Sequence, residues 1–103
     1  MTIPQKVRIN GVDYDVIKLA AKEGLIISEA TGAEVAGDIH YAGAFMRICE
    51  CLAPGQQQVV FWHEVLHAIL LNAETDKVPT IPDHLLTTIA RGINQVLEDN
   101  QLG

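Results

Sequence analysis

One pentapeptide in the chain combines the side chains that metal-dependent hydrolysis uses: His63-Glu64-Val65-Leu66-His67. Histidines four residues apart lie one above the other on a helix, so both imidazoles can reach one zinc ion at the usual nitrogen distance of about 2.0–2.1 Å. Glu64 then lies beside the ion, where its carboxylate can take a proton from water that the ion has acidified. We therefore predict His63 and His67 as zinc ligands and Glu64 as a general base.

The surroundings of the pentapeptide favour metal binding over a pair of surface histidines. Between Val59 and Leu71, only His63, Glu64 and His67 are not apolar. A helix that is apolar on all sides is a buried helix, and these three residues share one strip along it. Buried imidazoles and carboxylates need partners, whereas surface histidines would have polar neighbours. The sequence therefore predicts a cation bound in this strip.

A third ligand must come from elsewhere in the chain, because a catalytic zinc site has three protein ligands and one water. The downstream candidates are Glu74, Asp76, Asp83 and His84. Glu74 and Asp76 follow the end of the helix and are interpreted as solvated loop acids. Asp83 falls at the edge of the apolar face of the next predicted helix, and His84 falls almost opposite that face. We predict Asp83 as the third ligand and keep His84 as the alternative, because imidazole is the better zinc ligand.

Alternating apolar residues and turn signals predict short strands ahead of the histidines. Residues 6–9 and 12–17 alternate on either side of Asn10-Gly11, a strong hairpin signal. Residues 25–27 indicate another short strand, after a helical turn that residues 19–23 could form. Two more strands are predicted at residues 37–43 and 44–49, joined around Gly43.

Two helices are expected to follow the strands. The first is predicted over about residues 56–72, after the break at Pro54-Gly55. The capping-box pattern Thr80-x-x-Asp83, with Pro82 inside it, marks the start of a second helix that runs to about Glu98. Strands followed by helices indicate an α+β fold with a small antiparallel or mixed sheet of three to four strands. We expect one domain over residues 1–103.

The composition limits which classes of partner and which cellular compartment we expect for this protein. A net charge of −6, with seven Lys and Arg, argues against a nucleic-acid partner. No apolar stretch has the length of a membrane span or of a signal peptide, so we expect a cytoplasmic protein. Its partners would be peptides, proteins or a metal ion. Cys49 and Cys51 are interpreted as semi-buried thiols, with zinc ligation as the alternative.

Taken together, these residues resemble the zincin metallopeptidases, in particular short phage and prokaryotic proteins related to minimal gluzincins. The resemblance covers the hairpin of residues 6–17, the strand of residues 44–48, the sequence His-Glu-Val-Leu-His-Ala-Ile from His63, and the segment of residues 89–100. It implies zinc-dependent hydrolysis of peptide bonds. It also implies an acidic third ligand, usually Glu, early in the following helix, and Asp83 is the residue that matches this position.

The resemblance also implies how a substrate would bind. In the family, the strand before the active helix is an edge strand that can pair with a peptide, and residues 44–48 would take that role here. A donor to the transition state is implied as well, either Tyr41 or His40, because an alternating strand can direct only one of them into a cleft. The alternative function is a zincin-like metal-binding protein without peptidase activity, which binds a partner protein along this strand.

Overall fold

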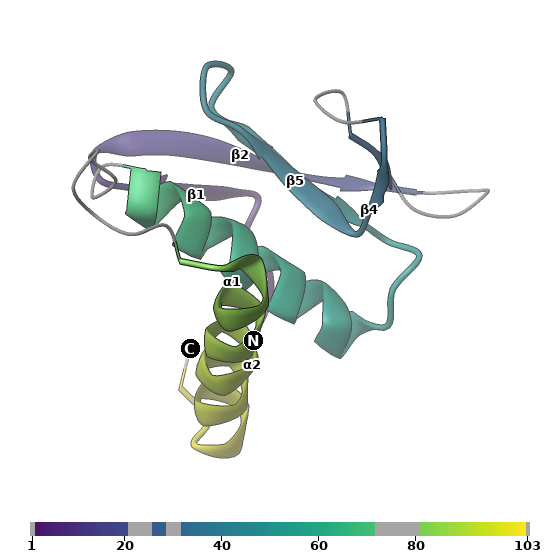
Figure 1. Ribbon diagram of the computed structural model, residues 1–103. Coiled ribbons are helices and arrows are strands. Elements are labelled where there is room, and N and C mark those ends of the chain that lie inside the picture. Colours follow the sequence, from purple (N-terminus) through teal and green to yellow (C-terminus); the bar gives the residue numbers. More distant parts are fainter. Residues whose placement is uncertain (1, 21–25, 29–31, 72–80, 103) are drawn as a thin grey trace.

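A computed structural model describes residues 2–20, 26–28, 32–71 and 81–102 (Figure 1). The fold is α+β, as predicted. Its main sheet has four strands in the order β1 (Lys6–Ile9), β2 (Val12–Leu19), β6 (Phe45–Cys49) and β5 (Gly37–His40). A second, two-stranded sheet pairs β3 (Ile26–Ile27) with β4 (Glu34–Val35). Two helices follow, α1 (Pro54–Leu71) and α2 (Asp83–Asp99).

The hairpin predicted at Asn10-Gly11 is confirmed. Asn10 and Gly11 have φ angles of 49° and 81°, and β1 pairs antiparallel with β2 so that Ile9 lies opposite Val12. Two consecutive residues with positive φ are the signature of a two-residue turn that matches the twist of the strands. Residue 19 belongs to β2, whereas residues 21–23 of the predicted helical turn lie outside the described residues.

The sheet is mixed because β6 pairs with β2 in parallel and with β5 antiparallel. Met46 of β6 lies opposite Val16 on one side and opposite Ile39 on the other. The prediction that residues 44–48 form the edge strand is therefore wrong, because β6 is an inner strand and β5 lies at the edge. Strand β5 comes before β6 in the sequence and lies at the edge of the sheet. A turn through Ala44, with φ of 54°, then leads the chain back to form β6 between β5 and β2.

The sheet, α1 and α2 form successive layers (Figure 1). Helix α1 packs against β1, β5 and β6 on one side and against α2 on the other. The main core lies between the sheet and α1, and its largest fully buried side chains include Phe61, Met46 and Ile48. The sequence suggested that this helix is buried on all sides. Helix α1 is instead partly exposed, because Ile69 and Leu71 near its end face solvent. None of the described helices is both long and apolar enough to cross a membrane.

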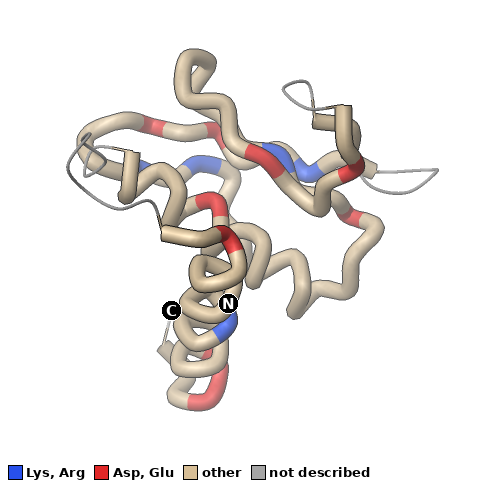
Figure 2. The backbone as a smooth tube through the Cα atoms, viewed as in Figure 1, with Lys and Arg blue, Asp and Glu red and all other residues tan. Residues whose placement is uncertain are grey.

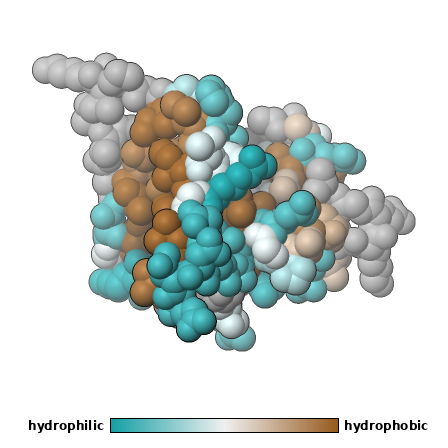
Figure 3. All heavy atoms as spheres, turned by 90° about the horizontal axis from the view of Figure 1, so that it is seen from below, coloured by the Kyte–Doolittle hydropathy of each residue, from teal (hydrophilic) through white to brown (hydrophobic). Residues whose placement is uncertain are grey.

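Helix α2 begins at Asp83 without a side-chain cap. Pro82 is its N-cap residue and makes no side-chain capping hydrogen bond, and Thr80 lies outside the described residues. Leu86 and Ala90 of α2 are buried, whereas Leu85 and Ile89 are exposed. Seen from below, the molecule has an area of hydrophobic atoms beside a hydrophilic one (Figure 3). Helix α2 is amphipathic, and the carboxylate of Asp83 in its first turn is exposed.

Gly37 sets the distance between α1 and the edge strand β5. A Cβ atom on Gly37 would lie 2.5 Å from Cγ1 of Val60 on α1 and 2.8 Å from the carbonyl oxygen of Arg47 on β6. Both distances are shorter than any ordinary carbon contact. The absence of a side chain therefore allows α1 to approach the sheet at this point, one helical turn before Glu64.

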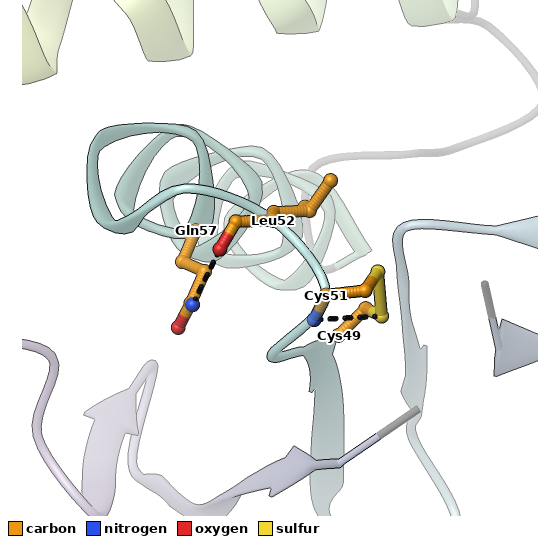
Figure 4. The surroundings of a disulfide bond; sticks show 4 residues. All are labelled: Cys49, Cys51, Leu52 and Gln57. Carbon is orange, nitrogen blue, oxygen red and sulfur yellow. Dashed lines mark hydrogen bonds between the residues drawn. A yellow bond between two sulfur atoms is a disulfide. The ribbon is translucent and has the colours of Figure 1, made fainter. Parts of the chain in front are cut away.

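Cys49 and Cys51 form a disulfide (Figure 4). The prediction of two thiols is therefore wrong, and so is the alternative of zinc ligation by them. In a continuing strand the two side chains would stand side by side on one face, but β6 ends at Cys49 and the chain turns there. The amide of Cys51 donates a hydrogen bond to Sγ of Cys49 over 3.2 Å. Gln57 Nε2 then donates to the carbonyl oxygen of Leu52 over 2.9 Å, which ties the turn to the start of α1.

Candidate metal centre

Three side-chain atoms from two helices converge at the start of α2. Nε2 of His63 lies 3.0 Å from Oδ1 of Asp83, and Nε2 of His67 lies 3.1 Å from the same oxygen. The two Nε2 atoms lie 3.1 Å from each other. The structure therefore brings together the three residues predicted as metal ligands.

The packing of the two helices explains this convergence. Val65 and Ala68 of α1 are buried in the core, which directs His63 and His67 away from the sheet and toward α2. Leu86 of α2 is buried, one turn after Asp83. The burial of Leu86 places the first turn of α2 over the histidines.

The contacts fit a shared cation better than a set of hydrogen bonds. Each Nε2 carries at most one hydrogen, which can point to one acceptor, and an ionised Asp83 supplies none. At most two of the three contacts can then be hydrogen bonds. Three lone pairs directed at one cation account for all three contacts, and ligands of one tetrahedral zinc ion lie about 3.3 Å from one another. Two imidazoles and a carboxylate are also a donor set that zinc accepts.

The three residues differ in how far they are open to solvent. The side chains of His63 and His67 are 16% and 31% exposed, and that of Asp83 is 73% exposed. Burial lowers the pKa of His63, and the neighbouring His67 lowers it further, while Asp83 acts in the opposite direction. A lowered pKa favours the neutral imidazole, which is the form that binds a metal.

Thr87 is a functional candidate that the sequence reasoning missed. Its Oγ1 lies 3.0 Å from Nδ1 of His63, on the side of the ring away from the ligand cluster. When Nε2 of His63 presents its lone pair to a metal, Nδ1 carries the hydrogen and donates it to Thr87, which holds the ring in place. The signal was present in the sequence, because Thr87 follows Asp83 by one helical turn and so shares its face.

Glu64 lies beside the cluster as a buried carboxylate. The residue is 5% exposed, and its Oε2 has no hydrogen-bond partner among the described residues. Burial raises the pKa of Glu64 to about 8, and the negative charges of Asp38 and Asp83 contribute to the increase. Buried carboxylate oxygens are rarely left without a partner, so this atom indicates a place where another group binds.

Asp38 of β5, whose charge contributes to the raised pKa of Glu64, belongs to a separate group of charged side chains on β5 and β6. Its carboxylate accepts hydrogen bonds from Arg47 of β6, at 2.8 Å from Nε to Oδ1 and from Nη2 to Oδ2, and lies 3.3 Å from Nε2 of His40. Although burial opposes ionisation of Asp38, Arg47 and His40 hold its pKa below the usual value. Arg47 also donates to the carbonyl oxygen of Ile27 over 3.4 Å, which links the small sheet to the main one.

A cleft of about 770 Å³ leads to the cluster. His63, Glu64 and Asp83 line it, together with residues of β4 and β5, of the first half of α1 and of α2. Apolar side chains, including Val35, Leu52, Val59 and Val60, line much of it. A mainly apolar cleft with a few polar groups is the usual form of a binding site for a small ligand or peptide.

Several other predicted candidates lie away from the cluster. His84 is exposed, and its carbonyl oxygen accepts a hydrogen bond from Thr88 Oγ1 over 3.0 Å. Glu74 and Asp76 lie outside the described residues. His40 stacks on Phe45 with 4.4 Å between ring centroids, and Tyr41 is exposed in the turn after β5. Neither His40 nor Tyr41 is among the described residues that line the cleft.

Comparisons of the chain with protein families, with curated proteins and with solved structures find no match. The case for a function therefore rests on the geometry of the cluster and the cleft.

Proposed function

We propose that this protein is a zinc-dependent metallopeptidase in which His63, His67 and Asp83 hold the ion and Glu64 is the general base. The observation that carries the proposal is a buried carboxylate oxygen of Glu64, unpartnered among the described residues, beside three converging ligand atoms, with His63, Glu64 and Asp83 all lining one cleft. A metal site that served the fold alone would not require a free carboxylate next to it.

Each residue of the chain has a distinct task in this proposal. When bound, a zinc ion supplies Lewis acidity, which polarises a carbonyl group and acidifies water. In the zinc-loaded protein Glu64 would be ionised, because a neighbouring positive charge favours the carboxylate over the protonated form. Glu64 would then take up a proton at Oε2 and return it to the leaving amine. Its low exposure keeps solvent from competing for that proton. Thr87 keeps the ring of His63 oriented through the 3.0 Å contact with Nδ1.

The edge strand β5 is the proposed docking surface for the substrate. It pairs with β6 on one side, and among the described strands none pairs with its other side. Gly37 of β5 lines the same cleft as Glu64. An extended peptide added to β5 would receive main-chain hydrogen bonds and pass the cleft that Glu64 lines. The docking role that the resemblance implied for residues 44–48 thus moves to the neighbouring strand.

A zincin-like metal-binding protein without peptidase activity is the second candidate. It is favoured by the location of His40 and Tyr41, the two alternatives for the donor to the transition state, outside the lining of the cleft. In that case β5 would bind a partner protein by the same strand addition, and the cluster would hold an ion that stabilises the helix pair.

The substitution Glu64→Gln separates the two candidates. Zinc content would be measured by elemental analysis, and cleavage of a mixed peptide library would be followed by mass spectrometry. We expect the variant to retain zinc and to lose hydrolysis by at least about a hundredfold, because a general base commonly contributes 10²–10⁴-fold. Glu50→Gln, which changes an exposed carboxylate in the turn after β6, should behave like the wild type. Equal activity of the Glu64 variant, or no cleavage by zinc-loaded wild type, would favour the second candidate.

A further inference from the structure

Helix α2 presents one stripe of polar residues to the cleft. Asp83, Thr87, Arg91 and Asn94 all line it, at spacings of four, four and three residues. Those spacings place the four side chains on one face of the helix. The stripe begins with the proposed third zinc ligand and its neighbour Thr87. It continues beyond them with Arg91 and Asn94, to which the proposed chemistry assigns no task.

Arg91 is a cation without a carboxylate partner among the described residues, in a mainly apolar cleft that also contains Glu64 and Asp83. It is the only lysine or arginine among the described residues that line the cleft, and no ion pair joins it to another described residue. Figure 2 shows acidic positions at both ends of α2 and a basic position between them. The chain as a whole has a net charge of −6. The guanidinium of Arg91 is thus available to bind an anionic group locally, although the net negative charge of the chain opposes anionic ligands at long range.

Asn94 provides a second, independent observation. Its side-chain oxygen is buried and has no hydrogen-bond partner among the described residues. A buried amide oxygen without a donor costs free energy unless a ligand supplies one. A peptide can supply it through a main-chain N–H. Arg91 therefore offers a donor fork to a ligand, and Asn94, three residues further on the same face, has an acceptor that would turn toward the cleft to meet the same ligand.

The distance from the metal cluster indicates which part of a peptide would reach this pair. Arg91 follows Asp83 by eight residues, so it lies about 12 Å further along α2. A segment of the peptide that leaves β5 and runs extended along α2 advances about 3.3 Å per residue, so it would reach Arg91 after three or four residues. The length of the arginine side chain widens the range to about two to four residues from the bond that is cleaved.

We propose that Arg91 and Asn94 form a specificity subsite that binds a carboxylate of the substrate, two to four residues from the scissile bond. The carboxylate can come from an acidic side chain or from the C-terminus of the peptide. The inference rests on the proposed peptidase function and adds a substrate class to it, namely acidic peptides. Arg91 binds the carboxylate through its guanidinium, and Asn94 accepts a main-chain N–H beside it.

The test compares matched peptides that differ by one charge. A peptide that the zinc-loaded protein cleaves is synthesised with Glu or Gln at each of the four positions on either side of the cleaved bond, and with a free or amidated C-terminus. The ratio of kcat/KM for each acid and its amide is then measured. We expect a preference of about tenfold for the acid at one position, or for the free C-terminus, which identifies the source of the carboxylate.

Variants of Arg91 assign the preference to this residue. In Arg91→Met the ratio should fall to about one, and Arg91→Lys should restore part of it, because lysine keeps the charge but loses the fork. Arg8→Met, at an exposed arginine on β1, should keep the full ratio. A ratio in Arg91→Met equal to that of the wild type would overturn the proposal. So would cleavage by the wild type without any acid preference, although the proposed function would then stand.

Binding measurements keep the subsite testable if no peptide is cleaved. The zinc-loaded Glu64→Gln variant would be titrated calorimetrically with two pools of random-sequence octapeptides. One pool carries Glu and a free C-terminus, and the other carries Gln and an amidated C-terminus. The difference in affinity measures the same preference without turnover. Tighter binding of the acidic pool that disappears in Glu64→Gln/Arg91→Met supports the subsite, even where the peptidase proposal fails. Equal binding of both pools overturns it.

Discussion

Asp83 Oδ1 lies 3.0 Å from Nε2 of His63, although the two residues belong to different helices and stand twenty positions apart in the chain. The same oxygen lies 3.1 Å from Nε2 of His67. This relationship turns a local motif on α1 into a site with three possible ligands. It also depends on how α1 and α2 pack, so that the fold and the metal centre are expected to stabilise each other.

Removal of the Asp83 carboxylate should weaken zinc binding strongly. In Asp83→Ala the two histidines remain, but the third ligand and its negative charge are lost. We expect zinc affinity to fall by more than about a hundredfold, measured by competition with a chromogenic chelator. The matched control is His84→Ala, which removes the exposed neighbour in the same helical turn. Similar losses in both variants would contradict the assignment of Asp83.

Thr87 should tune the metal site without contributing a ligand. Thr87→Val keeps the shape of the side chain but removes the acceptor for Nδ1 of His63. Loss of such a supporting contact commonly lowers metal affinity by about 10–100-fold. We expect a decrease in this range, and Thr87→Ser should recover most of it. Thr88→Val is the control, because Thr88 bonds to the carbonyl oxygen of His84 instead. An affinity for zinc in Thr87→Val equal to that of the wild type would show that the contact has no role.

The metal-free protein should lose stability as the pH rises, and Glu64 should be a cause. Its pKa is raised from 4.5 to about 8, mainly by burial, so the folded state holds a proton that the unfolded chain has released. Between pH 4.5 and 8 the folded state therefore binds more protons, and the free energy of unfolding decreases with pH. The full decrease is on the order of 5 kcal/mol at most. Glu64→Gln should lack this decrease.

Urea unfolding at pH 5 and pH 8 in the presence of a chelator measures the effect. The lowered pKa of His63 gives the opposite slope, but His63 is present in both proteins and cancels in the comparison. Parallel changes in wild type and variant between the two pH values would contradict the prediction for Glu64.

A methyl group at Gly37 should separate α1 from the edge strand. In Gly37→Ala the new Cβ would lie 2.8 Å from a backbone carbonyl oxygen, which cannot move independently of β6. We expect destabilisation of about 1–3 kcal/mol by thermal or chemical unfolding, as for other overpacked positions. Gly55→Ala, in the first turn of α1 with no atom within 4 Å of the new Cβ, should be neutral or stabilising. Equal stability of both variants would show that the close approach at Gly37 does not constrain the fold.

The sequence alone was sufficient for the elements whose signals are local. Asn10-Gly11 specifies its own turn because positive φ angles favour Asn and Gly at these positions. The long apolar run before Leu71 and the amphipathic pattern after Pro82 specify two helices, and both form close to their predicted bounds. The spacing of His63 and His67 places them on one face of any helix that contains them. All of these follow from contacts within a few residues.

The tertiary structure decided what depends on distant segments. The strand order could not be read from the pattern, because β6 alternates in the same way whether it lies at the edge or inside the sheet. The disulfide of Cys49 and Cys51 depends on where β6 ends. The choice between Asp83 and His84 depends on the rotation of α2 about its axis, which the burial of Leu86 against α1 sets. The sequence thus determined the motif, and the packing of two helices determined which carboxylate faces it.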